Sequence, residues 1–566
     1  MRIAAAVALW VLAGCASSVP PAERACARAR EFLSGRLDLY QDAVDRVARD
    51  YQIEQWKSET GDPAASPEKQ QALFAGLQDA AYRPEVLREA RETLAAAPPE
   101  CGQRSELERA VRLLEMSILE DPAVVAKERE NQRVQDDLTR KSNAFRLQVE
   151  GEAEPISQAL YGKKLASLAD RRARETLFRA HGGARGRAWL EWGFRGLIES
   201  RNAEAKLAGF PTYYEYRFSR SGLDLVSYRR AVEMLRTGFA PKVRALFAKL
   251  GQRAGIASVA PWDLRYLREK YAGGTLTPLL AGASEKFPLE LAASYYARLG
   301  HSIERYGFSM DLFPRPGKNT HAFAMGVWMP RVDASGKAVP PAPDIRLLAN
   351  LRKPVTWSDV STVIHEMGHA VHMAEVRQSL GIFRGVGSVE TEAIAMAFER
   401  LSGEPAFVIP ALASTSGGAM RVGRAAALNQ RAMRWEQSIS LLRQAFFSDF
   451  EWSLYHQAGA DPRELWARLH ESWWGIKVPP ALADWDIDHF MTAPVYVQNY
   501  ALGILIVEQI RSVVALDLGR GEGWRAIGDR IRREYLEPGL RYDYLELTRR
   551  LTGTALSPES AMRLLP

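Results

Sequence analysis

Apolar residues recur at three- and four-residue spacing through most of this chain. Between residues 25 and 300 this spacing is typical of amphipathic helices, and it is clearest at 107–119, 165–180 and 228–250. Turn-forming residues interrupt it at 61–63, 98–99, 182–183 and 273–274. The pattern therefore predicts a long helical N-terminal region, 25–300.

The pattern changes in the region 301–566. Two short runs, 321–328 and 345–351, read as strands, and the segment 330–344 between them is rich in Pro, Gly and Asp. After residue 355 the helical spacing returns and continues to the end. We expect a mostly α architecture with one small β-sheet.

The first fourteen residues have a different character. Met1-Arg2 precedes an apolar run at 3–12, which is too short to span a bilayer as a helix of about 20 residues. Residues 1–14 are therefore expected to be a signal peptide, which implies export. The cysteine at position 15 could stand after an ordinary signal peptide by chance.

The other interpretation of Cys15 is lipidation. Leu12-Ala13-Gly14-Cys15 resembles a bacterial lipobox, which implies cleavage before Cys15 and acylation of that residue. Residues 15–24 would then be a tether to a membrane, because several acyl chains anchor a protein firmly. Ala16, in place of an acidic residue, favours the outer membrane, facing the periplasm, if the host has two membranes.

Charge and cysteine content narrow the function only slightly. The net charge is +7 over 566 residues, with arginine spread along the chain, so we expect no nucleic-acid partner. Lipidation of Cys15 leaves Cys26 and Cys101, which could form a disulfide in an oxidising compartment or remain two free thiols.

The clearest chemical signal is His365-Glu366-Met367-Gly368-His369. We expect a helix capped at Ser358-Asp359, and on it two histidines four residues apart share one face. That arrangement can bind one Zn²⁺ ion per chain, with Glu366 as the general base. Imidazole and carboxylate ligands also accept Co²⁺ or Mn²⁺.

A catalytic zinc site needs a third protein ligand. Glu390 and Glu392 are both candidates, and they lie on different faces of the next predicted helix. Glu392 and Glu399 are seven residues apart and share a face, which favours Glu392 as the ligand and Glu399 as a group that orients one. Glu390 can instead stabilise the start of the helix.

Four blocks of sequence resemble the thimet oligopeptidase and oligopeptidase F family of zinc metallopeptidases: 313–323, 362–372, 389–399 and 489–503. The resemblance implies an elongated helical body with a deep channel, which admits short peptides and excludes folded proteins. It implies Tyr500 as the donor to the reaction's oxyanion, with Tyr496 second, and His489 as a group that binds substrate. We expect an oligopeptidase that acts as a monomer.

Two alternatives stay open. Angiotensin-converting enzyme, a more distant cousin, has the same His-Glu-Met-Gly-His sequence and a lysine that holds the substrate carboxylate, where this chain has Ile487. A carboxydipeptidase would therefore need another cationic group in the channel. A non-catalytic peptide-binding lipoprotein is the second alternative, although His365, Glu366, His369 and Glu392 are all retained.

Overall fold

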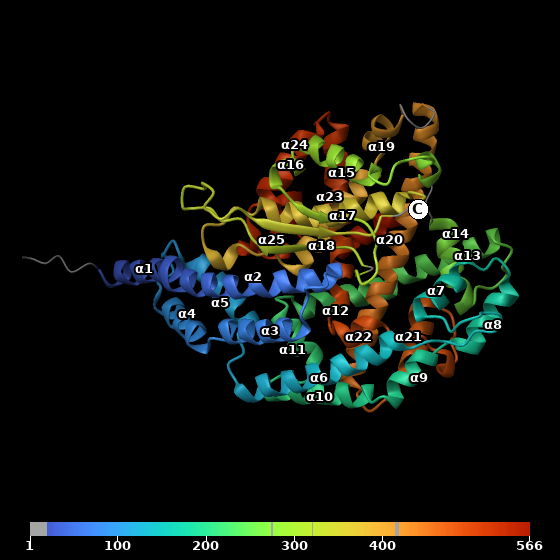
Figure 1. The fold of residues 1–566 in the computed structure, drawn as a ribbon, viewed down its shortest axis with the longest axis horizontal. Helices are drawn as coiled ribbons and strands as arrows, with labels where there is room; N and C mark the ends of the chain where they lie inside the picture. The colour runs from blue at the N-terminus through green and yellow to red at the C-terminus, as the bar shows by residue number, and fades with distance from the viewer. Residues whose placement is uncertain (1–19, 273–275, 320, 352, 414–417, 566) are drawn as a thin grey trace, which may run out of the picture.

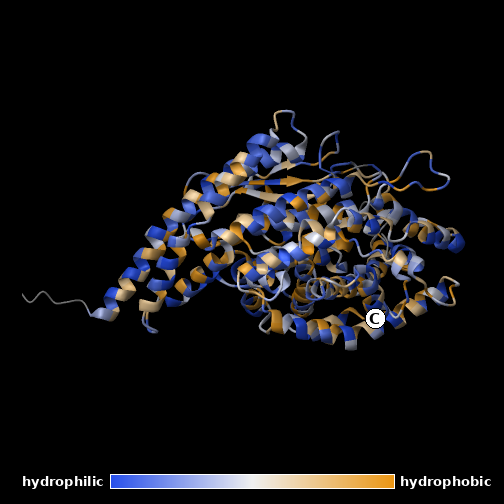
Figure 2. Cartoon of the chain, turned by 90° about the horizontal axis from the view of Figure 1, so that it is seen from below, coloured by the Kyte–Doolittle hydropathy of each residue, from blue (hydrophilic) through white to orange (hydrophobic). Residues whose placement is uncertain are grey.

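The computed structural model describes residues 20–272, 276–319, 321–351, 353–413 and 418–565. Within these ranges the chain is an elongated body of helices with one small sheet (Figure 1). Hydrophobic and hydrophilic residues alternate along most helices, as the amphipathic pattern predicts (Figure 2). The predicted mostly α fold class is therefore confirmed.

The helices before the sheet are α1 (Pro21–Glu31), α2 (Asp38–Thr60), α3 (Pro67–Ala81), α4 (Pro84–Ala96), α5 (Arg104–Ser117), α6 (Pro122–Ala144), α7 (Gln158–Ser167), α8 (Arg171–His181), α9 (Ala184–Glu191), α10 (Phe194–Leu207), α11 (Tyr213–Arg220), α12 (Leu225–Met234), α13 (Ala240–Arg253), α14 (Pro261–Ala272), α15 (Phe287–Arg298) and α16 (Ile303–Tyr306).

The helices after the sheet are α17 (Trp357–Glu375), α18 (Ser388–Ser402), α19 (Pro405–Leu412), α20 (Ala419–His456), α21 (Pro462–Trp474), α22 (Asp488–Thr492), α23 (Val497–Gly519), α24 (Trp524–Ile531) and α25 (Tyr544–Thr552). None of the helices in the described ranges is both long enough and apolar enough to cross a bilayer.

The sheet contains β1 (Ser309–Asp311), β2 (Phe323–Trp328) and β3 (Asp344–Leu348), in the order β1-β3-β2. β3 is parallel to β1 and antiparallel to β2, so β2 is an edge strand. On one face, Ala324 belongs to a small apolar cluster with Ala370 and Met373 of α17. On the other, Phe323 packs edge-on against Trp56 of α2. β2 therefore lies between α2 and α17.

The core of the C-terminal region is built around α17, α18 and α23. The apolar stripe predicted for α17 is confirmed, because Val360, Val363 and Ile364 are all fully buried. Gly368 permits the close approach of α18: a Cβ atom there would lie 2.9 Å from the Cα of Ala395. The small residue inside the His-Glu-Met-Gly-His sequence thus brings the two helices together.

The N-terminal helices form a second, smaller hydrophobic cluster of their own. It includes Phe32, Leu87 and Leu107 from α1–α5 and their connections, and Phe383 from the loop between α17 and α18. Cys101 is part of the cluster and Cys26 packs against it, and both thiols are free. The N-terminal helices therefore pack against the loop that leads into α18.

Several predicted boundaries were wrong. The helix expected to be capped at Ser358-Asp359 begins earlier: the Thr356 side chain accepts from the Asp359 backbone N–H and the Asp359 side chain accepts in return, a capping box. The segment 165–180 is two helices, because Asp170 caps α8 by accepting from Arg172. β1 has only three residues, too few to show an alternating pattern, and was not predicted. The predicted break at 273–274 lies outside the described residues.

Candidate metal centre

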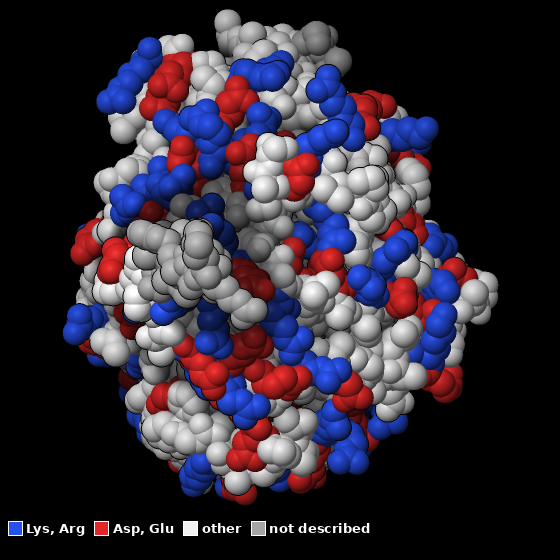
Figure 3. All heavy atoms as spheres, turned by 90° about the vertical axis from the view of Figure 1, so that its left-hand side faces the viewer, with Lys and Arg blue, Asp and Glu red and all other residues white. Residues whose placement is uncertain are grey.

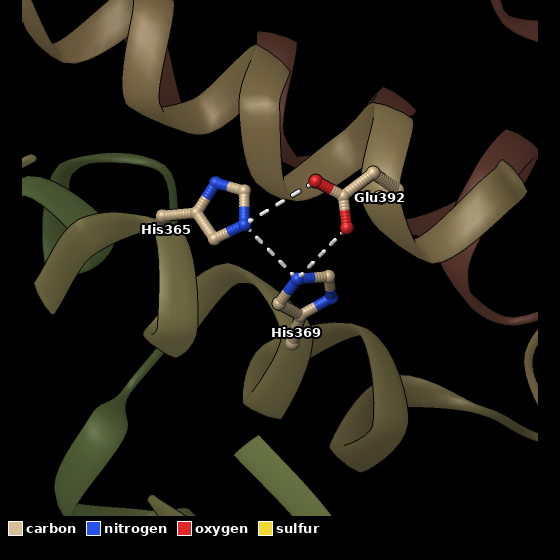
Figure 4. Close-up of side chains that lie close together, drawn as sticks. All are labelled: His365, His369 and Glu392. Carbon is tan, nitrogen blue, oxygen red and sulfur yellow. Dashed lines mark hydrogen bonds and ion pairs between the residues drawn. The ribbon is translucent and has the colours of Figure 1, made fainter. Parts of the chain in front are cut away.

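Two imidazole rings project from the partly exposed face of α17. The Nε2 atoms of His365 and His369 lie 3.1 Å apart, one helical turn from each other (Figure 4). Their side chains are 19% and 15% exposed. The opposite face of α17 is buried, so core packing directs both rings toward the same partly open space.

Glu392 on α18 completes a group of three donors. Its Oε1 lies 3.7 Å from His365 Nε2, and its Oε2 lies 3.7 Å from His369 Nε2 (Figure 4). One donor atom from each of His365, His369 and Glu392 lies within 4.8 Å of the other two, which is close enough for all three to bind one metal ion. Donors about 2.0 Å from a tetrahedral zinc ion lie about 3.3 Å apart, so the observed spacing and ligand types fit zinc.

Each histidine has a partner at its other ring nitrogen. Glu399 Oε2 lies 3.3 Å from His365 Nδ1, and Thr391 Oγ1 lies 2.9 Å from His369 Nδ1. A proton on Nδ1 bonded to these acceptors leaves the Nε2 lone pair free to bind a cation. α18 therefore supplies one candidate ligand and the two groups that orient the others. Thr391 was not among the predicted site residues, because no spacing in the sequence marks a threonine beside Glu392 as a partner of His369.

Glu390 does not join this group. It is 8% exposed, and burial raises the pKa of its carboxyl to about 7, although its own backbone N–H, Arg109 and the N–H of Tyr544 favour the ionised form. Its contacts are thus with the start of α18 and with α25. Of the two carboxylates left open by the sequence, only Glu392 reaches the histidines.

Glu366 lies beside the two histidines and accepts a backbone N–H from Ala324 of β2. Burial, with the charges of Glu392 and Glu399, raises the pKa of Glu366 to about 7, while His365 acts to lower it. Burial alone would lower the pKa of His365, but Glu399, Glu392 and Glu366 together raise it to about 9. A carboxyl group with a pKa near neutrality is suited to transferring protons.

His489, Tyr496 and Tyr500 form an aromatic group beside the metal centre. The Tyr500 hydroxyl lies 3.5 Å from His489 Nε2, and the two tyrosine rings meet edge to face at 5.5 Å. Burial raises the pKa of both tyrosines, and the Glu392 carboxylate raises it further. Both hydroxyls are therefore protonated at neutral pH and can donate hydrogen bonds near Glu392.

A strained turn precedes these tyrosines. Val495 has a φ of 56°, a left-handed conformation that is costly for a β-branched residue. Its N–H donates to Glu451 Oε1 at 2.8 Å, and its carbonyl accepts from Gln498 at 2.6 Å. Neither Val495 nor Glu451 was predicted, because the contact joins α20 to a residue 44 positions away.

Two hollows lie at the two ends of β2. One, of about 620 Å³, is lined by His321, just before the strand, and by His489. The other, of about 480 Å³, is lined by Met329, just after the strand, and by Asn499. β2 therefore runs from one hollow to the other, and each hollow is lined by a residue near the metal centre, His489 in one and Asn499 in the other.

His372, also part of the sequence block at 362–372, is not positioned as a ligand. It is 1% exposed, and neither ring nitrogen has a hydrogen-bond partner within the described structure. Burial lowers its pKa to about 3, so the ring is neutral. His372 is therefore part of the buried face of α17.

Known families and structures resemble this chain over most of its length. The family model described as Peptidase family M3 matches residues 164–564. A structure of an oligoendopeptidase F is 15% identical, covers 96% of this chain and 94% of its own, and has a TM-score of 0.65. A second oligoendopeptidase F, from Bacillus anthracis str. Ames, is 14% identical, with coverages of 92% and 94% and a TM-score of 0.60. PZ peptidase A with a bound inhibitor is 16% identical, with coverages of 96% and 95% and a TM-score of 0.63. At these identities the structural likeness shows the fold.

Proposed function

This chain belongs to peptidase family M3 and is a metalloendopeptidase that hydrolyses peptide bonds; we propose that it uses one zinc ion held by His365, His369 and Glu392. The donor geometry supports the proposal. Two imidazoles and a carboxylate are a common ligand set for catalytic zinc in peptidases, with a further position left for water or substrate. When bound there, zinc supplies Lewis acidity, which activates water and polarises the scissile carbonyl.

Glu366 is the proposed general base. Its carboxylate takes a proton from the attacking water and passes that proton to the leaving amine. Its position beside His365, next to the group of candidate metal ligands, supports this role. The N–H of Ala324 holds the carboxylate in place between the helix and β2.

Tyr500 is the proposed donor to the oxyanion that develops on the substrate carbonyl, with Tyr496 second and His489 binding substrate. The protonated hydroxyl near Glu392 and the contact with His489 support this assignment. A pre-positioned donor at a developing oxyanion is worth about 10²–10³ in rate.

The proposed substrates are short, extended peptides. A peptide can pair with the free edge of β2 through its backbone, which favours affinity without requiring one particular sequence. The hollows at the two ends of the strand can take the residues on either side of the scissile bond. Most of a folded protein offers no free extended segment, so we propose an oligopeptidase. We also propose that it acts as a monomer.

One observation keeps dipeptide release as a second candidate. Arg146 and Arg265 line the hollow beside His489; within the described structure neither forms an ion pair, although the charge of Arg265 acts on the nearby Asp484 carboxyl. Either could hold the C-terminal carboxylate in place of the lysine whose position Ile487 occupies. Mass spectrometry of the products separates internal cleavage from the release of C-terminal dipeptides.

We also propose that the chain is exported and anchored to a membrane through a lipid on Cys15, in the outer membrane if the host has two. The sequence at 12–15 supports this, and residues 1–19 lie outside the described residues. Labelling of the wild type, but not of Cys15→Ala, with a fatty acid would test it.

The observation that carries the catalytic proposal is the convergence of His365, His369 and Glu392. The decisive experiment is cleavage of a quenched fluorescent peptide of about nine residues by protein lacking residues 1–14. A chelator should abolish the activity, zinc should restore it, and Glu366→Gln should lose at least about a thousandfold in kcat while binding zinc normally.

Glu522→Gln is the matched control, because Glu522 is exposed and its side chain has no hydrogen-bond partner within the described structure. If folded, zinc-loaded wild type leaves a broad peptide library intact, the protein instead matches the non-catalytic binding alternative.

A further inference from the structure

We propose that the hollow at the Met329 end of β2 is a substrate subsite that selects an acidic side chain through Arg220. The inference rests on the proposed function, because it assigns a preference to the same peptide-binding site. It goes beyond that function by naming the residue and the class of side chain that it recognises.

The subsite is built from both halves of the chain. Leu113 and Met116 of α5 form part of one wall, and Val389 of α18 and Asn499 of α23 form part of the other. The residues from α5 precede position 164, where the match to the family model begins. The composition of this hollow is therefore set in part by the N-terminal helices of this particular chain.

The hollow lies within reach of an extended peptide bound at the catalytic residues. Ala324, which contacts Glu366, and Met329, which lines the hollow, are separated by five residues along β2 and its end. At about 3.3 Å per residue that is roughly 16 Å. A substrate paired with β2 therefore places a side chain three to five positions from the scissile bond in the hollow.

Two of the three arginines that line the hollow are already occupied. Arg384 pairs with Asp42 at 3.1 Å and with Asp38 at 3.7 Å. Arg109 donates to the carbonyls of Leu540 and Tyr542. Arg384 is therefore already paired with carboxylates, and two bonds to carbonyls hold Arg109 against the wall, against a single such bond for Arg220.

Arg220 is different. Its Nη2 donates to the Ser117 carbonyl at 3.3 Å, and its guanidinium lies 5.8 Å from the Tyr216 ring. No carboxylate lies within ion-pair distance of it in the described part of the chain. The half-buried guanidinium therefore has unused N–H groups at the wall of the hollow, where a carboxylate would gain charge-assisted hydrogen bonds.

The acidic residues of the hollow do not cancel this charge. Asp543 accepts from the Glu546 N–H as the cap of α25, and Glu390 accepts its own backbone N–H and that of Tyr544. Asp45 accepts from Gln41 and lies 4.0 Å from Arg384. Each carboxylate is thus engaged by groups other than Arg220.

A second polar group in the hollow suits a peptide backbone. Asn499 is 4% exposed, and its Oδ1 has no hydrogen-bond partner within the described structure. Because it precedes Tyr500 on α23, an N–H from a bound peptide could donate to it close to the catalytic residues. An unsatisfied buried acceptor is costly, which suggests that a ligand supplies its partner.

The face of the molecule that carries α1 does not supply such a preference. On the face that carries α1, basic and acidic side chains are intermingled (Figure 3). No patch of one sign on that face accounts for selection of an acidic residue, so the proposal assigns it to a specific contact.

The test uses peptides of one length that carry Glu, Gln or Lys at each position three to five residues from the scissile bond, on either side. Wild type should prefer Glu over Gln about tenfold in kcat/KM at one position. Arg220→Gln should remove this preference, so that the Glu and Gln peptides are cleaved with kcat/KM values within about twofold of each other. Arg220→Glu should reverse it in favour of Lys, and Arg253→Gln, an exposed arginine far along α13, should behave as wild type.

The same peptides should be bound to the Glu366→Gln variant by calorimetry, with and without Arg220→Gln. A Glu-over-Gln ratio in Kd that depends on Arg220 supports the subsite even if no peptide is cleaved, so failure of catalysis and failure of the subsite are distinguishable. A ratio near one in both assays, or a preference that survives Arg220→Gln, overturns the inference.

Discussion

Glu399 Oε2 lies 3.3 Å from Nδ1 of His365, on the side of the ring opposite the candidate metal position. Glu399 follows Glu392 by seven residues on α18, so two turns of one helix supply both a candidate ligand and the carboxylate that orients another. A carboxylate at the second nitrogen of a ligating histidine fixes the tautomer and makes the ring a stronger base.

Loss of the Glu399 carboxylate should weaken metal binding. We expect Glu399→Ala to lower zinc affinity about 10–100-fold, because His365 loses the group that holds its proton and its orientation. Competition with a chromogenic chelator measures the change. The same affinity as the wild type in a correctly folded variant would show that Glu399 does not act on His365.

Removal of the Tyr500 hydroxyl should slow the chemical step. We expect Tyr500→Phe to lower kcat about a hundredfold or more, with a much smaller change in KM, because the donor acts on charge that develops in the transition state. Tyr496→Phe provides the comparison and should cost less. Steady-state kinetics on one peptide decides between the two, and a larger effect at Tyr496 would reverse their assignment.

Glu451 should make stability depend on pH. Burial raises its pKa to about 8, against the opposing effects of the Val495 N–H, Arg201 and Arg217. In unfolded protein the value is about 4.3, so the folded state retains a proton that the unfolded state loses, and stability falls as pH rises toward 8.

Glu451→Gln keeps an acceptor for Val495 but removes this titration. The variant should match wild type at pH 4 and exceed it by at least about 1 kcal/mol at pH 9, since each pKa unit is worth about 1.4 kcal/mol. Urea unfolding at the two pH values measures the difference. Parallel profiles for wild type and variant would rule out a buried, titrating Glu451.

The contact between Arg384 and α2 should stabilise the loop before α18. Arg384 is 8% exposed in its side chain and pairs with Asp38, Asp42 and Asp45. We expect Arg384→Ala to lower the free energy of unfolding by about 1–3 kcal/mol, because the partly buried aspartates lose their counter-charge. It should also speed proteolytic cleavage within 380–388. Unchanged cleavage would mean that the packing of Phe383 and the bond from the Gly381 N–H to Asp38 hold the loop without Arg384.

The parts of the site that could be predicted are those set by local helix geometry. His365 and His369 share a face because they are one turn apart, and the structure places Glu392, which the seven-residue spacing to Glu399 favoured, near them. The sequence could not show that Ala324 would reach Glu366, because that contact depends on how β2 packs against α17.

The turn that carries Tyr496 and Tyr500 was equally hidden. Val495 has a left-handed conformation that is stabilised by Glu451 from a different helix. No residue type near Val495 in the sequence predicts this conformation. The fold class followed from periodicity, whereas the contacts of the N-terminal helices with the loop at 380–384 required the three-dimensional structure.

The free edge of β2 also has a consequence for colloidal behaviour. An unpaired strand edge is a template for association with other chains, and proteins usually blunt it with charge, proline or a covering element. Here α2 packs over one face of that strand, with Trp56 against Phe323. Removal of the N-terminal helices should therefore do more than reduce activity: it would expose an apolar face of the strand beside its free edge. The truncated protein should then self-associate, visible as increased light scattering.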